Sequence, residues 1–75
     1  MPKKTTEQDK LYMQRVGNYI KNVRLKHNMS QGEMAKVMDC TQQTVSYTER
    51  GIRSCSAISL IRVIEFDGKL LKNIL

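Results

Sequence analysis

Residues 30–51, SQGEMAKVMDCTQQTVSYTERG, decide the fold of this chain. Ser30 and Glu33 form a capping-box pattern, in which each side chain accepts a hydrogen bond from the other residue's backbone amide at a helix start. The apolar residues that follow recur at the spacing of one helix face, and Ala35 is small enough for close packing. The first half of the stretch therefore predicts a helix over about 31–38.

The second half of the stretch predicts another helix after a tight turn. Thr41 is a residue type that caps helices, and Gly51 is the type found just past their ends. This helix is expected over about 42–50, and it opens with Gln42 and Gln43. Their amides both donate and accept hydrogen bonds, which suits phosphates and base edges.

The chain before this stretch predicts one helix preceded by a short arm. Thr6 can cap the helix, and Asn28 can take the left-handed conformation that ends it. Gly17 weakens the helix by about 1 kcal/mol relative to Ala and can mark close contact with a neighbouring helix. Residues 1–6 are expected to be a flexible basic arm. The residues at helical spacing are Tyr12, Val16, Ile20, Val23 and His27, with Tyr19 beside them.

The chain after the stretch predicts two more helices. Ser54 or Ser56 caps a fourth helix, which breaks at Gly68. A fifth, short and mostly apolar helix is expected over 69–75. Five helices with short connections make an all-α bundle, so residues 7–75 are expected to be a single domain.

The composition fits a small helical domain with a polyanionic partner. Hydrophobic residues make up 40% of the 75 residues, with four Gly and one Pro, which argues against disorder and an all-β fold. The net charge of +6 favours nucleic acid first and an anionic membrane surface second, while ordinary surface charge for solubility is the third interpretation. Residues 1–27 carry seven Lys or Arg residues and two Asp or Glu residues. Residues 28–55 carry three of each kind and have no net charge.

Several classes of protein lack support in the sequence. No apolar run is long enough to cross a bilayer, and no signal peptide is visible. Cys40 and Cys55 have no CxxC spacing, and His27 is the only histidine, so we expect reduced thiols in the cytoplasm and no metal site. Without a Gly-rich phosphate loop, an acid pair or a Cys/His arrangement, neither an enzyme nor a cofactor or small-molecule ligand is indicated.

Matches to one protein family are spread over residues 16–66. They are Gly17, Ile20 and Arg24 in the first helix, Ser30, Gln31, Glu33, Met34 and Ala35 for the family's S-Q-x-E-L-A, Val45 and Ser46 for its I-S, Glu49, Arg50 and Gly51 for its E-R-G, and Arg53 and Ser56 after that. The chain thus resembles the helix-turn-helix domain of lambdoid phage repressors, Cro proteins and the wider Xre family. The resemblance implies a five-helix bundle that usually binds DNA as a dimer, in a bacterium or a phage-infected host.

The resemblance also implies that the helix at about 42–50 enters the DNA major groove, where each base pair has a distinct donor and acceptor pattern. Gln42 is then the first candidate for a base contact and Gln43 the second, because a Gln amide can bind adenine N6 and N7 together. Ser46 and Tyr47, one turn further on, are candidates for a base or the backbone. The competing interpretations are solvated polar residues at a helix start and, for Tyr47, surface packing.

Further residues are implied to bind phosphates. Gln31 resembles the family's glutamine that binds phosphate and braces the first glutamine of the recognition helix, and Thr41 is expected to donate to a phosphate. Arg53 is a third candidate, with a solvated arginine as the alternative. Lys3 and Lys4 resemble the basic arm of some of these repressors, with a disordered charged tail as the alternative.

Four residues bear on the scaffold. The resemblance places Arg24 and Glu49 in a partly buried ion pair, so both are excluded from the DNA-reading set. Asp39 stands where the family most often has Gly, at a turn position that favours the left-handed conformation. Thr48 replaces a large apolar residue, which either loosens the packing or leaves room for a neighbour such as Phe66.

Taken as a whole, the sequence predicts a sequence-specific regulator of transcription that binds double-stranded DNA. We expect a repressor that occupies a roughly palindromic operator as a homodimer, either as a complete Cro-like protein or as the N-terminal half of a longer one. The alternative is an antitoxin-type or protein-interaction module with the same fold. The expected dimer surface comprises Leu70, Leu71, Ile74 and Leu75.

Overall fold

The computed structural model of the chain describes residues 6–68, which form four α-helices and no strand. The all-α class is therefore confirmed, and the described residues contain four of the five expected helices. The expected arm residues Lys3 and Lys4 and the expected helix at 69–75 lie outside the described residues. In chain order the helices are α1 (Glu7–Lys26), α2 (Gln31–Met38), α3 (Gln42–Glu49) and α4 (Ala57–Phe66).

Every helix begins at a hydroxyl side chain. Thr6, Ser30, Thr41 and Ser56 are the N-caps of α1 to α4, and each accepts a hydrogen bond from the backbone amide three residues further on. Of the two candidates for the cap of α4, Ser56 is the one that the chain uses. Local side-chain chemistry thus sets where each helix starts.

A left-handed residue makes the turn between α2 and α3. Asp39 has a φ of 56° and a ψ of 52°, the conformation that the sequence predicts for this position. Asn28, after the end of α1, also has a φ of 56°. Both residues turn the chain within a few positions, and after the turn at Asp39 α3 packs on α2.

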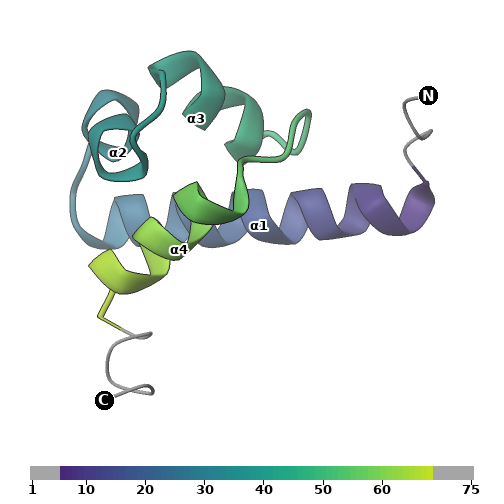
Figure 1. Ribbon diagram of the computed structural model, residues 1–75, viewed down its shortest axis with the longest axis horizontal. Coiled ribbons are helices and arrows are strands. Elements are labelled where there is room, and N and C mark those ends of the chain that lie inside the picture. Colours follow the sequence, from purple (N-terminus) through teal and green to yellow (C-terminus); the bar gives the residue numbers. More distant parts are fainter. Residues whose placement is uncertain (1–5, 69–75) are drawn as a thin grey trace.

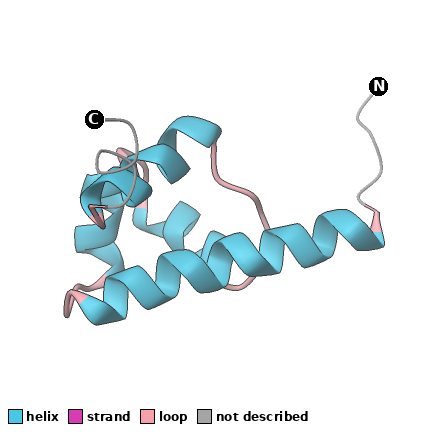
Figure 2. Ribbon diagram, turned by 90° about the horizontal axis from the view of Figure 1, so that it is seen from below, coloured by secondary structure: helices cyan, strands magenta, loops and turns pink. Residues whose placement is uncertain are grey.

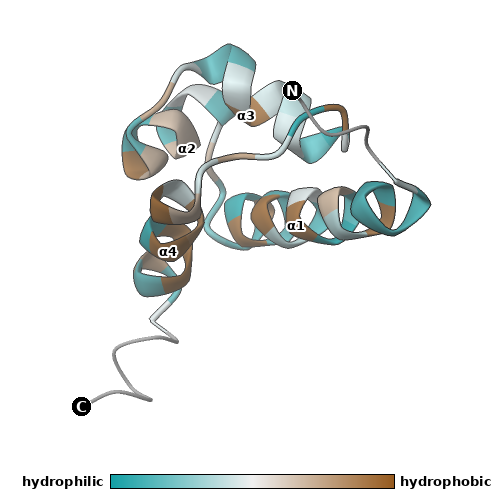
Figure 3. Cartoon of the chain, turned by 45° about the vertical axis from the view of Figure 1, so that its right-hand side comes forward, coloured by the Kyte–Doolittle hydropathy of each residue, from teal (hydrophilic) through white to brown (hydrophobic). Residues whose placement is uncertain are grey.

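The long α1 forms a base on which α3 and α4 pack, and α2 packs on α3 and α4 (Figures 1 and 2). α3 contacts α1 and α2, while α4 contacts α2 and α1. α4 is the most hydrophobic of these helices, and the N-terminal end of α1 is hydrophilic (Figure 3). The buried apolar core draws on all four helices and consists of Ile20, Val23, Met34, Ala35, Met38, Val45 and Val63.

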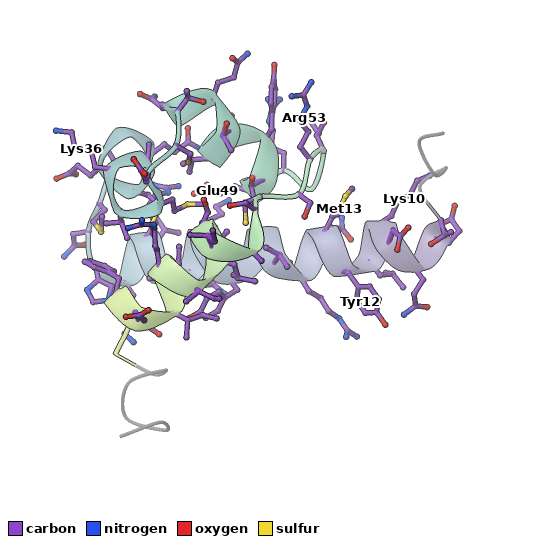
Figure 4. The ribbon with its side chains drawn as sticks, in the orientation of Figure 1. Lys10, Tyr12, Met13, Lys36, Glu49 and Arg53 are labelled. Atoms are coloured by element: carbon purple, nitrogen blue, oxygen red, sulfur yellow. The ribbon has the colours of Figure 1, made fainter. Side chains whose placement is uncertain are left out.

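The first turns of α1 project beyond the bundle. Tyr12 lies at the helical spacing of the core residues, yet it is 51% exposed, because α2, α3 and α4 do not reach that far along α1. Figure 4 shows Tyr12 and Lys10 on this projecting part, away from α2 and α3. The buried face of α1 therefore begins only at about Gly17.

α1 and α3 meet at Gly17 in close backbone contact. A Cβ atom on Gly17 would lie closer than 3.0 Å to the carbonyl oxygen of Thr48 and 3.1 Å from that of Glu49. Thr48 itself is fully buried, and its hydroxyl donates to the carbonyl of Thr44 at 2.8 Å. Phe66 does not lie buried beside it, since Phe66 is 41% exposed.

Polar contacts hold both ends of α4 in place. The hydroxyl of Ser59 donates to the backbone carbonyl of Met38 at 2.9 Å, and this bond satisfies one of the free carbonyls at the end of α2. At the other end of α4, the buried carboxylate of Asp67 accepts from Nζ of Lys26 at 3.0 Å and lies 3.4 Å from Nε2 of His27. α4 is therefore held against α1 and α2, and the outer side of α3 is open to solvent.

Candidate nucleic-acid interface

One face of α3 is polar and open to solvent. Gln42 and Gln43, its first two residues, are exposed, and Ser46 and Tyr47 are half-buried one turn further on. The opposite face is buried against α1 and α2. No charged side chain occurs between Gln42 and Thr48, so this face offers neutral donors and acceptors.

Gln42 lies against the start of α2. A Cβ atom on Gly32 would be only 3.3 Å from Oε1 of Gln42, so the bare glycine makes room for this amide. The sequence predicted that Gln31 contacts and orients Gln42, but among residues 6–68 no hydrogen bond joins these two side chains. Instead, Nε2 of Gln31 donates to Oε1 of Glu49 at 3.2 Å. Since a Gln amide carries two N–H donors, the second N–H of Gln31 is available to a phosphate.

Glu49 joins α3 to α1 and α2. Nε of Arg24 donates to Oε2 of Glu49 at 2.7 Å, and Nη2 donates to Oε1 at 3.1 Å. Nη1 of Arg24 donates to the carbonyl of Met29 at 3.0 Å. The side chain of Glu49 is only 4% exposed, and the hydrogen bonds to it raise the pKa of Arg24 above its ordinary value. The side chains of Arg24 and Glu49 therefore hold the helices together. Figure 4 shows Glu49 inside the fold and Arg53 on the outside.

Thr41 and the segment after α3 lie at the two ends of the polar face. Thr41 is exposed, and its hydroxyl oxygen lies 2.9 Å from that of Thr44 and accepts from the amide of Thr44 at 3.1 Å. At the other end, the guanidinium carbons of Arg50 and Arg53 lie 5.2 and 5.4 Å from the centroid of the Tyr47 ring. Arg50 was not among the DNA-contact residues expected from the sequence, although its i, i+3 spacing from Tyr47 was a usable signal.

Other kinds of site find little support in the described part of the chain. No group of His, Cys, Asp and Glu residues between 6 and 68 is placed to hold a metal ion. None of the helices there is long and apolar enough to span a membrane. Cys40 and Cys55 are free, half-buried thiols, and burial raises the pKa of both. Six expected site residues lie outside the described range: Lys3, Lys4, Leu70, Leu71, Ile74 and Leu75.

Two short helices joined at a left-handed residue, the second with an exposed polar face, define a helix-turn-helix domain. A search against protein families agrees, since the family described as Helix-turn-helix matches residues 20–70. The chain therefore belongs to this family, of the Xre and lambda-repressor type, and is a DNA-binding regulator. No curated protein and no solved structure matches the chain significantly.

Proposed function

We propose that this protein is a transcriptional repressor that binds a palindromic operator in double-stranded DNA as a homodimer. The observation that carries the proposal is the neutral, solvent-exposed face of α3, which the ion pair between Arg24 and Glu49 ties to α1. A helix held in this way enters the major groove with little loss of freedom. Occupancy of the operator then blocks RNA polymerase.

The exposed face of α3 supplies the sequence discrimination. Gln42 reads the first base pair, and a bidentate contact to adenine discriminates by about 1–3 kcal/mol. Gln43, Ser46 and Tyr47 contribute further contacts along the groove. The phosphates on either side are bound by Gln31, Thr41 and Arg53, and by Lys3 and Lys4 from the arm.

The operator symmetry follows from the dimer. We place the dimer contacts in residues 69–75, through Leu70, Leu71, Ile74 and Leu75, because their apolar pattern calls for a partner. Two copies related by a two-fold axis set two α3 helices about 34–36 Å apart, one turn of DNA. The two half-sites are then inverted repeats with that spacing.

Selection of bound sequences from random duplexes, followed by a salt titration, tests the function. We expect a palindromic consensus and an affinity that falls steeply as salt rises. Gln42→Ala should relax the preference at one symmetric base position, whereas the matched control Gln8→Ala, in the first turn of α1, should leave the consensus unchanged. Absence of any enrichment over random DNA at low salt would refute the proposal.

A protein-interaction module of the antitoxin type is the second candidate, and one feature favours it. An open groove of about 570 Å³ lies between α2 and α4, and Ile58 on its wall is 66% exposed. If this groove carries the function, the wild-type chain shows no salt-dependent DNA binding. If α3 carries it, Ile58→Ser leaves the affinity for the selected operator unchanged.

A further inference from the structure

Tyr47 makes contacts in two directions from the end of α3. Its hydroxyl accepts a hydrogen bond from Nε2 of Gln43 at 2.9 Å. Its ring lies under the guanidinium groups of Arg50 and Arg53, at 5.2 and 5.4 Å from the centroid. These are distances at which a cation is attracted to the face of an aromatic ring. One half-buried side chain thus connects a base-reading candidate to two positive charges.

The backbone also brings Arg53 to this ring. Gly51 takes a φ of 73°, which turns the chain back after α3. The amides of Ile52 and Arg53 then both donate to the carbonyl oxygen of Tyr47, at 3.0 and 3.4 Å. The position of Arg53 beside Tyr47 is therefore a product of the loop geometry as well as of the side chains.

The two guanidinium groups carry charge that no nearby acid neutralises. Arg50 and Arg53 are exposed, and neither takes part in an ion pair with a carboxylate of residues 6–68. Both positive charges lie within 5.4 Å of the centre of one ring, so phosphates of a bound duplex can neutralise the two of them at one place. Guanidinium groups stack on aromatic rings and still present their N–H donors to phosphate oxygens.

We propose that Tyr47 is a positioning residue that couples base reading to phosphate binding. Its ring holds Arg50 and Arg53 as a two-arginine clamp for neighbouring phosphates of the DNA backbone, and its hydroxyl orients the amide of Gln43. This inference rests on the proposed DNA-binding function and goes beyond it by assigning Arg50 a phosphate-binding role and Tyr47 a positioning role. In this role Tyr47 acts through the side chains that it positions.

The arginine clamp is tested first, by salt titration of binding to a random-sequence duplex. Removal of one arginine–phosphate interaction lowers the slope of log affinity against log salt by about 0.9, so Arg50→Gln combined with Arg53→Gln should lower it by about 1.8. Arg62→Gln is the matched control, because Arg62 is an equally exposed arginine on α4, away from α3. A slope that changes no more in the double variant than in the control overturns the clamp.

Two substitutions at Tyr47 separate its ring from its hydroxyl. Tyr47→Phe keeps the ring, so binding to random duplex should persist while discrimination at one base pair of the selected operator falls. Tyr47→Leu removes both groups, and freeing two arginines should weaken binding to random duplex by about three- to tenfold per arginine. When Arg50→Gln and Arg53→Gln are already present, Tyr47→Leu should cause no further loss of affinity for random duplex.

The outcomes distinguish this inference from the proposed function. If the wild-type chain shows no salt-dependent DNA binding, both fail together. If the wild type binds but Tyr47→Leu weakens binding equally with and without the two arginines, only the coupling role is wrong. Thermal unfolding of each variant shows whether the fold persists, and should Tyr47→Leu unfold, Tyr47→Phe and the arginine variants decide the matter.

Discussion

Replacement of Gly17 by alanine should destabilise the protein, although alanine is the better helix former. Gly17 lies in α1, where the substitution gains about 1 kcal/mol in helix propensity. The added Cβ, however, would overlap the carbonyl oxygen of Thr48 and lie 3.1 Å from that of Glu49. These are backbone atoms of α3, so they cannot rotate away as the end of a side chain can.

The steric cost outweighs the gain in propensity. Overpacking of this kind costs about 1–3 kcal/mol and occasionally more. Relief requires α1 and α3 to separate, and separation lengthens the hydrogen bonds of 2.7 and 3.1 Å that join Arg24 to Glu49. Because the Cβ would overlap a backbone atom, we take the upper end of the steric cost, about 3 kcal/mol, and subtract the gain of about 1 kcal/mol in helix propensity, which leaves a net loss of about 2 kcal/mol in the free energy of unfolding. That is a large part of the roughly 4–11 kcal/mol expected for a domain of 75 residues.

Urea unfolding followed by circular dichroism measures this loss. With a slope of about 1–2 kcal/mol per molar urea, the midpoint of Gly17→Ala should fall by about 1–2 M. Gly32→Ala is the matched control, because its Cβ would meet side-chain atoms and no backbone, the nearest being the end of the Gln42 side chain at 3.3 Å. Its midpoint should hold or rise. An unchanged or higher midpoint for Gly17→Ala would show that α1 and α3 are not in close backbone contact.

Three further substitutions test the scaffold. Arg24→Ala leaves the buried carboxylate of Glu49 without its cation, so the free energy of unfolding measured in urea should fall by about 3–5 kcal/mol. A fall of less than about 1 kcal/mol contradicts the ion-pair role. Asp39→Gly relieves the left-handed backbone and should stabilise by up to about 1 kcal/mol by the same assay, whereas destabilisation argues against the turn geometry. The hydrogen bond from the amide of Ser30 holds the pKa of Glu33 below its ordinary value of 4.5. Because the folded-state pKa is the lower one, its stabilisation is complete above about pH 4.5 and disappears as pH falls through the folded-state pKa. The stability difference between wild type and Glu33→Gln should shrink over that acid range, and a constant difference contradicts the capping box.

Features that depend on neighbours in sequence were predictable. The N-caps at Thr6, Ser30 and Thr41 were predicted from sequence because a cap needs only a hydroxyl and an amide three residues away. The left-handed turn at Asp39 followed from the family resemblance, and the bare position at Gly17 already indicated a close helix contact. The contacts of the individual base and phosphate candidates with DNA remain predictions.

Features that depend on the arrangement of whole helices were not predictable. Tyr12 has the spacing of a core residue, but its exposure depends on how far α1 extends past the other helices. The contact of Arg53 with Tyr47 depends on the turn at Gly51, which no residue periodicity encodes. The bond from Gln31 to Glu49, in place of a brace to Gln42, depends on the angle between α2 and α3.

The two faces of α3 allow mutations to change DNA specificity without changing the stability of the fold. Val45 and Thr48 are fully buried, while Gln42 and Gln43 are exposed on the other face. Substitutions on the outer face should then add to core substitutions without coupling. A library randomised at Gln42 and Gln43 should stay folded in nearly every member, so new operator sequences are open to this protein through a few mutations that leave its architecture unchanged.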